Sequence, residues 1–77
     1  MMRVVELPRG EKAPAGADRI IIYRQADDEF RVDGALIALH TAELFTPTPF
    51  STEKEALAVS LKWARSKRVK VIFVERR

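Results

Sequence analysis

The fold is decided by residues 49–74, which read PFSTEKEALAVSLKWARSKRVKVIFV. Thr52 can cap a helix by accepting a hydrogen bond from an amide of the first turn, and Glu55, three residues later, gives the form of a capping box. Acidic residues near this start and basic residues near the end at Ser66 both suit the helix dipole. The stretch therefore predicts an amphipathic helix that leads directly into a strand.

The buried face of the expected helix has small residues along its middle. Ala56, Ser60 and Ala64 recur every four residues, and larger apolar side chains lie on either side of them. At about 100° per residue, these three positions share one face. Small side chains there would let the helix axis approach a sheet closely.

Residues 69–74 read VKVIFV and predict a strand, because β-branched and aromatic residues dominate them. Val71 and Phe73 alternate onto one face, while Ile72 and Val74 make the other face apolar as well. A strand that is apolar on both faces is typical of the centre of a sheet.

Length and composition describe a small domain with no membrane segment. The chain has 77 residues, of which 47% are hydrophobic, and it has no cysteine. Disulfides, thiolate metal sites and cysteine nucleophiles are thereby excluded. No apolar run approaches the roughly 20 residues that span a bilayer, and the N-terminus does not resemble a signal peptide. We expect a cytoplasmic protein without membrane contact.

Residues 1–17 are expected to form a flexible tail, in which Val4 to Leu7 could make a short edge strand, and residues 18–77 a single small α+β domain. Residues 8–17 hold two prolines and two glycines without periodicity. Arg19 to Arg24, reading RIIIYR, predicts the first strand of the domain. Phe30 to Val32 predicts its antiparallel neighbour across a polar loop.

Residues 34–45 allow three interpretations. Asp33 and Gly34 could form a hairpin turn before a third strand, or the second strand could continue through a bulge at Gly34. A helix capped by Asp33 is the third possibility, because ALIALHTAELF contains good helix formers. Extended structure is preferred, since a small sheet needs further partners.

The expected fold class is α+β, with a mixed sheet of 3 to 4 strands, one amphipathic helix on one face, and the element order β-β-(β)-α-β. If the final strand lies parallel to its predecessor, it enters by a right-handed crossover. No diagnostic motif indicates a family.

No catalytic, cofactor-binding or metal-binding residue is predicted. His40 is the single histidine, and no arrangement of serine or cysteine beside it suggests a nucleophile. The acidic residues from Asp27 to Asp33 lack the spacing of a calcium loop, and the three scattered glycines form no phosphate-binding loop. We therefore expect no enzymatic activity.

Charge is distributed unevenly along the chain. Residues 62–77 contain seven basic residues against one acid, and residues 26–55 contain seven acids against two basic residues. If the basic residues share a surface, phosphate is their natural partner. The candidate phosphate-binding residues are Lys62, Arg65, Lys67, Arg68, Lys70, Arg76 and Arg77.

Other roles compete with phosphate binding. The same basic residues could complement the helix dipole, protect a strand edge or end the chain. The aromatic residues lie at apolar-face positions, so none is an obvious platform for stacking bases.

The preferred function is therefore a non-enzymatic binding or protein-interaction domain, with nucleic acid as the alternative partner. The uneven charge favours a protein partner or self-association. Phe45 and Phe50, in a proline-flanked segment, are candidates for an apolar protein contact, although they could instead close the core beneath the helix.

Overall fold

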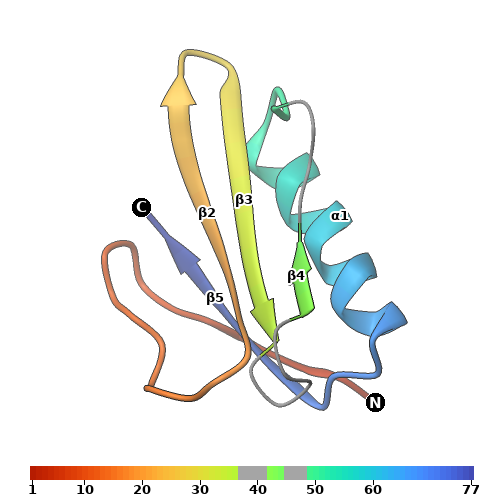
Figure 1. Ribbon diagram of the computed structural model, residues 1–77. Coiled ribbons are helices and arrows are strands. Elements are labelled where there is room, and N and C mark those ends of the chain that lie inside the picture. The colour runs from red at the N-terminus through yellow and green to blue at the C-terminus, as the bar shows by residue number, and fades with distance from the viewer. Residues whose placement is uncertain (37–41, 45–48) are drawn as a thin grey trace.

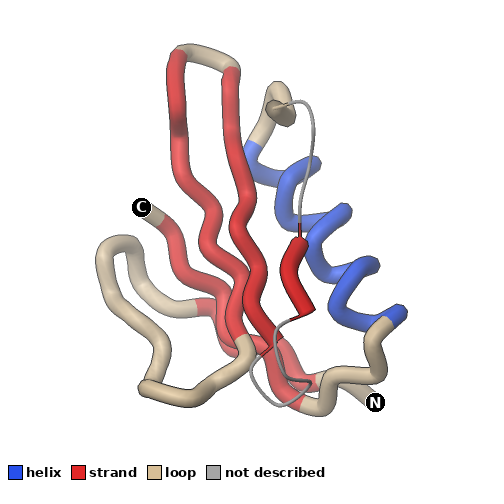
Figure 2. The backbone as a smooth tube through the Cα atoms, viewed as in Figure 1, coloured by secondary structure: helices blue, strands red, loops and turns tan. Residues whose placement is uncertain are grey.

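The structure, a computed structural model, describes residues 1–36, 42–44 and 49–77. These residues form a single mixed sheet and a helix (Figure 1). In chain order the elements are β1 (Arg3–Glu6), β2 (Arg19–Ala26), β3 (Glu29–Leu36), β4 (Ala42–Leu44), α1 (Glu53–Ser66) and β5 (Val71–Arg76). The strand order is β1-β5-β2-β3-β4, in which β1, β5 and β2 run parallel while β3 is antiparallel to both neighbours. Figure 2 shows the strands in red and the helix in blue.

Helix α1 begins at the predicted cap. The Thr52 Oγ1 accepts a hydrogen bond from the Glu55 amide at 3.1 Å, and Thr52 itself is extended. The Glu55 carboxylate accepts from the Ser51 hydroxyl at 3.2 Å and does not complete the expected box. The Thr52 cap is thus confirmed, whereas the Glu55 carboxylate accepts from Ser51 instead of from the Thr52 amide.

The helix packs on one face of the sheet through its small residues. Ala56, Ser60 and Ala64 are completely buried, and the Ser60 hydroxyl donates to the Ala56 carbonyl at 2.6 Å. They meet the helix-facing side of the sheet, whose buried residues are Ile20, Ile22, Val32, Leu36, Ile72 and Val74. The prediction of a small-residue contact stripe is confirmed.

The predicted fold class is confirmed, with one strand more at the N-terminus. From β2 onward the elements follow the expected order, and β5 is central as its two apolar faces indicated. The expected tail at residues 1–17 contains β1, whose Val4 pairs with Ile72 and whose Glu6 pairs with Val74. The sheet therefore extends into this segment, and the possible short edge strand there is present as β1.

The connection from β1 to β2 is built from two tight turns. The Glu11 amide donates to the Pro8 carbonyl at 3.0 Å, and the Ala17 amide donates to the Pro14 carbonyl at 3.2 Å. Gly10 and Gly16, each third in its turn, have φ values of +86° and +82°. A type II turn requires a positive φ at its third residue, which glycine adopts without strain.

This crossover loop (residues 7–18) passes over the face of the sheet opposite the helix. Glu75 alternates with the helix-facing Ile72 and Val74, so its side chain lies on the far face, where its Oε2 accepts from the Ala13 amide at 3.1 Å. The β1-to-β2 connection and the β4-to-β5 connection each join two parallel strands, and they cross the sheet in opposite directions. Right-handed crossovers must then lie on opposite faces. In Figure 1 the loop (orange) lies well away from α1.

Strand β3 settles part of the ambiguous region. It continues through Gly34 to Leu36 without a register shift there, and Gly34 pairs with Ile20 on one side and Leu44 on the other. The hairpin turn at Asp33 and the helix that it might cap are therefore both wrong, and Gly34 makes no bulge. A third strand does follow, as β4, while residues 37–41 lie outside the described residues.

Candidate nucleic-acid interface

Helix α1 ends in a turn that presents basic side chains. The Val69 amide donates to the Ala64 carbonyl at 3.4 Å and the Arg68 amide to the Arg65 carbonyl at 3.0 Å, which is the hydrogen-bond pattern of a Schellman motif. Arg68 has a φ of 58° at the position that glycine usually takes in this motif. A non-glycine residue held in this conformation costs about 1 kcal/mol. Arg68 nevertheless occupies this position, so an exposed guanidinium lies at the turn.

Four of the seven predicted basic residues meet around this turn. They lie on the last turn of α1, its C-cap and the entry to β5, and all are exposed: Arg65, Lys67, Arg68 and Lys70. The pairing of β1 with β5 adds Arg3, whose amide donates to the Lys70 carbonyl at 2.8 Å. We call these five residues the basic corner. Sequence reasoning missed Arg3, because only the pairing of β1 brings it here.

The cations of the basic corner have no acidic partner in the described part of the chain. The ion pairs found there involve Arg9, Arg19, Arg24, Arg76 and Arg77. None involves a residue of the basic corner. Unpaired cations held close together repel one another, so a polyanion that bound them would relieve this repulsion.

Arg76 and Arg77 lie at the opposite end of β5. Six strand residues at about 3.3 Å each place them about 20 Å from Lys70. Arg77 lies 3.6 Å from a Glu75 oxygen, and Arg76 lies 2.6 Å from carboxylate oxygens of both Glu6 and Glu53. These two cations are therefore already neutralised.

Glu53 links this opposite end to the helix. Burial by itself would raise the pKa of Glu53, but hydrogen bonds and charge from Arg9 and Arg76 outweigh it and hold the pKa below its ordinary value of 4.5. The hydrogen bond to Glu6 is the largest of the effects that raise the pKa of Arg76. The network ties α1, β1 and β5 together, which assigns Arg76 a structural role.

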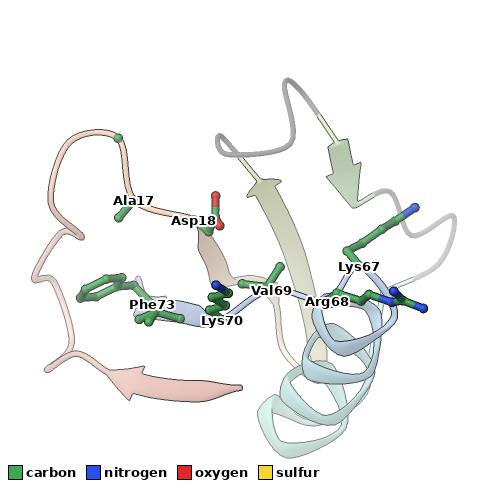
Figure 3. Close-up of a pocket in the computed structure, with 9 residues that line it drawn as sticks. Ala17, Asp18, Lys67, Arg68, Val69, Lys70 and Phe73 are labelled. Atoms are coloured by element: carbon green, nitrogen blue, oxygen red, sulfur yellow. The ribbon is translucent and has the colours of Figure 1, made fainter. Parts of the chain in front are cut away.

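A pocket of about 430 Å³ opens beside the basic corner (Figure 3). One wall is the end of the crossover loop, Gly16 to Asp18, and the other is the chain from Lys67 to Lys70. Val71 and Phe73 of β5 form the floor between them. Its lining is mainly apolar, and Lys67, Arg68 and Lys70 supply its positive charge. Asp18, on the loop wall, is the acidic residue of the lining.

Phe73 contributes to this pocket rather than to the core beneath the helix. It alternates with the buried Ile72 and Val74, so it lies on the far face of the sheet, and it is half-buried. Val71, beside it on the same face, is 40% exposed. Phe73 therefore lies in the lining of the pocket, because the far face carries a loop instead of a helix.

The remaining predicted residues contribute little here. Lys62 is exposed on α1. Phe50 forms a two-way backbone bridge with Phe30, at 2.7 and 2.8 Å, and packs against the core, while Phe45 and His40 lie outside the described residues. In the described ranges no three metal-ligating side chains cluster, and no helix is long and apolar enough to cross a membrane.

Comparisons with protein-family models, with curated proteins and with solved structures find no significant match for this chain. Its function must therefore be argued from the site itself.

Proposed function

We propose that this domain is a non-enzymatic binding module that holds nucleic acid through phosphate contacts at the basic corner. The observation that carries the proposal is the contrast between the two ends of β5. Cations at one end are exposed and without acidic partners among the described residues, whereas Arg76 and Arg77 at the other end are paired with carboxylates. Electrostatic binding to phosphates requires exposed cations that no carboxylate already neutralises.

Several adjacent cations favour a chain of phosphates over a single anion. Arg65, Lys67 and Arg68 follow one another around the helix end, and Lys70 and Arg3 continue onto the neighbouring strands. Four or five phosphate contacts without base recognition give dissociation constants on the order of 10⁻⁴ to 10⁻⁶ M at physiological salt. We expect binding in that range, weakening steeply as salt is added.

A protein partner is the second candidate. Ile21 and Tyr23 are half-buried on the far face of the sheet, and Val59 on α1 is 40% exposed, so apolar area is available. The acidic residues at the β2–β3 hairpin are a weaker argument for a protein partner, since Asp27 is already paired with Arg24 at 2.6 Å. If sedimentation showed a dimer that dissociates into monomers as salt is added, charge-paired self-association would be favoured over the nucleic-acid proposal.

The proposal is tested by the salt dependence of binding to a fluorescent single-stranded 12-nucleotide oligomer. With four to five phosphates neutralised, the logarithm of the association constant should fall against the logarithm of salt with a slope of about −3. Replacing Lys67, Arg68 and Lys70 together by glutamine should reduce the slope by about 2 and weaken binding about tenfold or more. Fluorescence anisotropy measures both quantities.

The matched control replaces Lys12, Arg24 and Lys54 by glutamine, which removes the same charge from exposed positions outside the basic corner. Binding by this control should stay within about twofold of the wild type. Equal losses in the two triple variants would mean that net charge alone drives binding, and the basic corner would lose its assigned role.

Arg68→Gly should change stability and binding in opposite directions. Glycine adopts the φ of 58° without strain, so the free energy of unfolding should rise by about 0.5 to 1 kcal/mol. The loss of one phosphate contact should weaken oligonucleotide binding about threefold. Urea unfolding and anisotropy on the same preparation test this. A variant that gained stability and bound as tightly as the wild type would remove Arg68 from the interface.

A further inference from the structure

We propose that the pocket beside the basic corner receives one unstacked base of a single-stranded nucleic acid, whose phosphates lie on the basic corner. This inference rests on the proposed function, and it names the form of nucleic acid that the site would take. Three observations carry it: the size of the pocket, the apolar surface at one end, and the position of the cations at the other.

The first observation is volume. Pockets that hold small molecules measure roughly 300 to 1,000 Å³, and this pocket, at about 430 Å³, has room for a single nucleotide. The pocket is open to solvent, so a base that belongs to a longer strand can enter it.

The second observation is the surface that a base would meet. Phe73 and Val71 are neighbours on the far face of β5 and line the pocket, with Ala17 on the opposite wall. Val71 is 40% exposed, which is unusual for a β-branched residue in a central strand. A base stacked on the Phe73 ring would cover this apolar surface, and stacking tolerates any base because each has a π-face.

The third observation is the arrangement of charge. In Figure 3, Phe73 lies toward one end of the pocket and Lys67 and Arg68 toward the other, with Lys70 between them. A nucleotide is apolar at its base and anionic at its phosphate, so it matches the pocket in one orientation.

The loop wall is shaped in advance for such a ligand. The Pro14-to-Ala17 turn fixes Gly16, and the Phe73 amide donates to the Asp18 carbonyl at 3.0 Å, so this wall is hydrogen-bonded to the strand that forms the floor. A preformed wall reduces the entropy lost on binding. A base inside a duplex cannot reach the floor, because stacking holds it between its neighbours.

The test compares three probes at matched total phosphate concentration: a mixed-sequence single-stranded 12-mer, the same strand made fully abasic, and the blunt 12-base-pair duplex. Wild-type protein should bind the 12-mer about tenfold more tightly than the abasic strand, as expected for one stacked base. Phe73→Leu, which keeps an apolar side chain on the floor, should bind the 12-mer and the abasic strand nearly equally.

The outcomes separate this inference from the function on which it rests. If no probe binds, the proposed function fails. If all three bind equally and Phe73→Leu changes nothing, phosphate binding stands and the base pocket is refuted. As a second readout, the ring protons of Phe73 should shift upfield with the 12-mer and stay in place with the abasic strand. An unmoved ring in the presence of bound 12-mer would also overturn the inference.

Discussion

Glu75→Ala is expected to lower the free energy of unfolding by about 2 to 4 kcal/mol, because it leaves a cavity at a buried position and removes the acceptor of the Ala13 amide. The Glu75 side chain is 2% exposed and accepts from the Ala13 amide at 3.1 Å. It also lies 4.0 Å from Arg19 and 3.6 Å from Arg77. The total free energy of unfolding of a 77-residue domain is about 4 to 12 kcal/mol, so the loss would be a large share of it.

Two further variants separate the carboxylate from the volume that it fills. Glu75→Met keeps most of the volume and removes the acceptor, so it should remain destabilised and should expose the Ala13 amide to fast hydrogen exchange. Glu75→Gln keeps an acceptor for Ala13 and should lose less, about 1 kcal/mol. Urea unfolding and amide exchange measure the two effects. If Glu75→Met were as stable as the wild type, the carboxylate would contribute nothing, and the crossover loop would be held by other contacts.

Ser60→Leu should cost about 1 to 3 kcal/mol through overpacking, because Ser60 is completely buried at the centre of the contact between α1 and the sheet. Ser60→Ala should be tolerated, since the hydroxyl donates only to the Ala56 carbonyl one turn earlier in the same helix. Thermal melts of the two variants compare their melting temperatures with that of the wild type.

Val59→Leu is the matched control for Ser60→Leu. It enlarges an apolar residue of the same helix at a position that is 40% exposed, so the melting temperature should hardly change. Unchanged melting for Ser60→Leu would contradict the close approach of helix and sheet.

The helix and its following strand could be predicted from sequence because their signals are local. Thr52 caps α1, Ala56 and Ser60 share its buried face, and the apolar run into Val74 forms β5. The two turns of the crossover loop have a local signal as well. In both Pro8-Arg9-Gly10-Glu11 and Pro14-Ala15-Gly16-Ala17, glycine stands third, as a type II turn requires.

The basic corner could be predicted only in part, because its members come together through tertiary structure. Arg65 to Lys70 are close in sequence and share a helix end, so their grouping was visible. Proximity in sequence also groups Arg76 and Arg77 with them, yet an extended strand carries these two residues about 20 Å away. Arg3 pairs in β1 with Val71, 68 positions later, which no local pattern indicates.

The central claim, that the basic corner binds nucleic-acid phosphates, is tested most directly by an amide chemical-shift titration of isotope-labelled protein with the single-stranded 12-mer, at low and then at raised salt. We expect shifts at Arg3, from Arg65 to Lys70 and around Phe73 that salt reverses, with the hairpin of β2 and β3 unaffected. A spectrum that does not change, or shifts confined to Arg76 and Arg77, would contradict it.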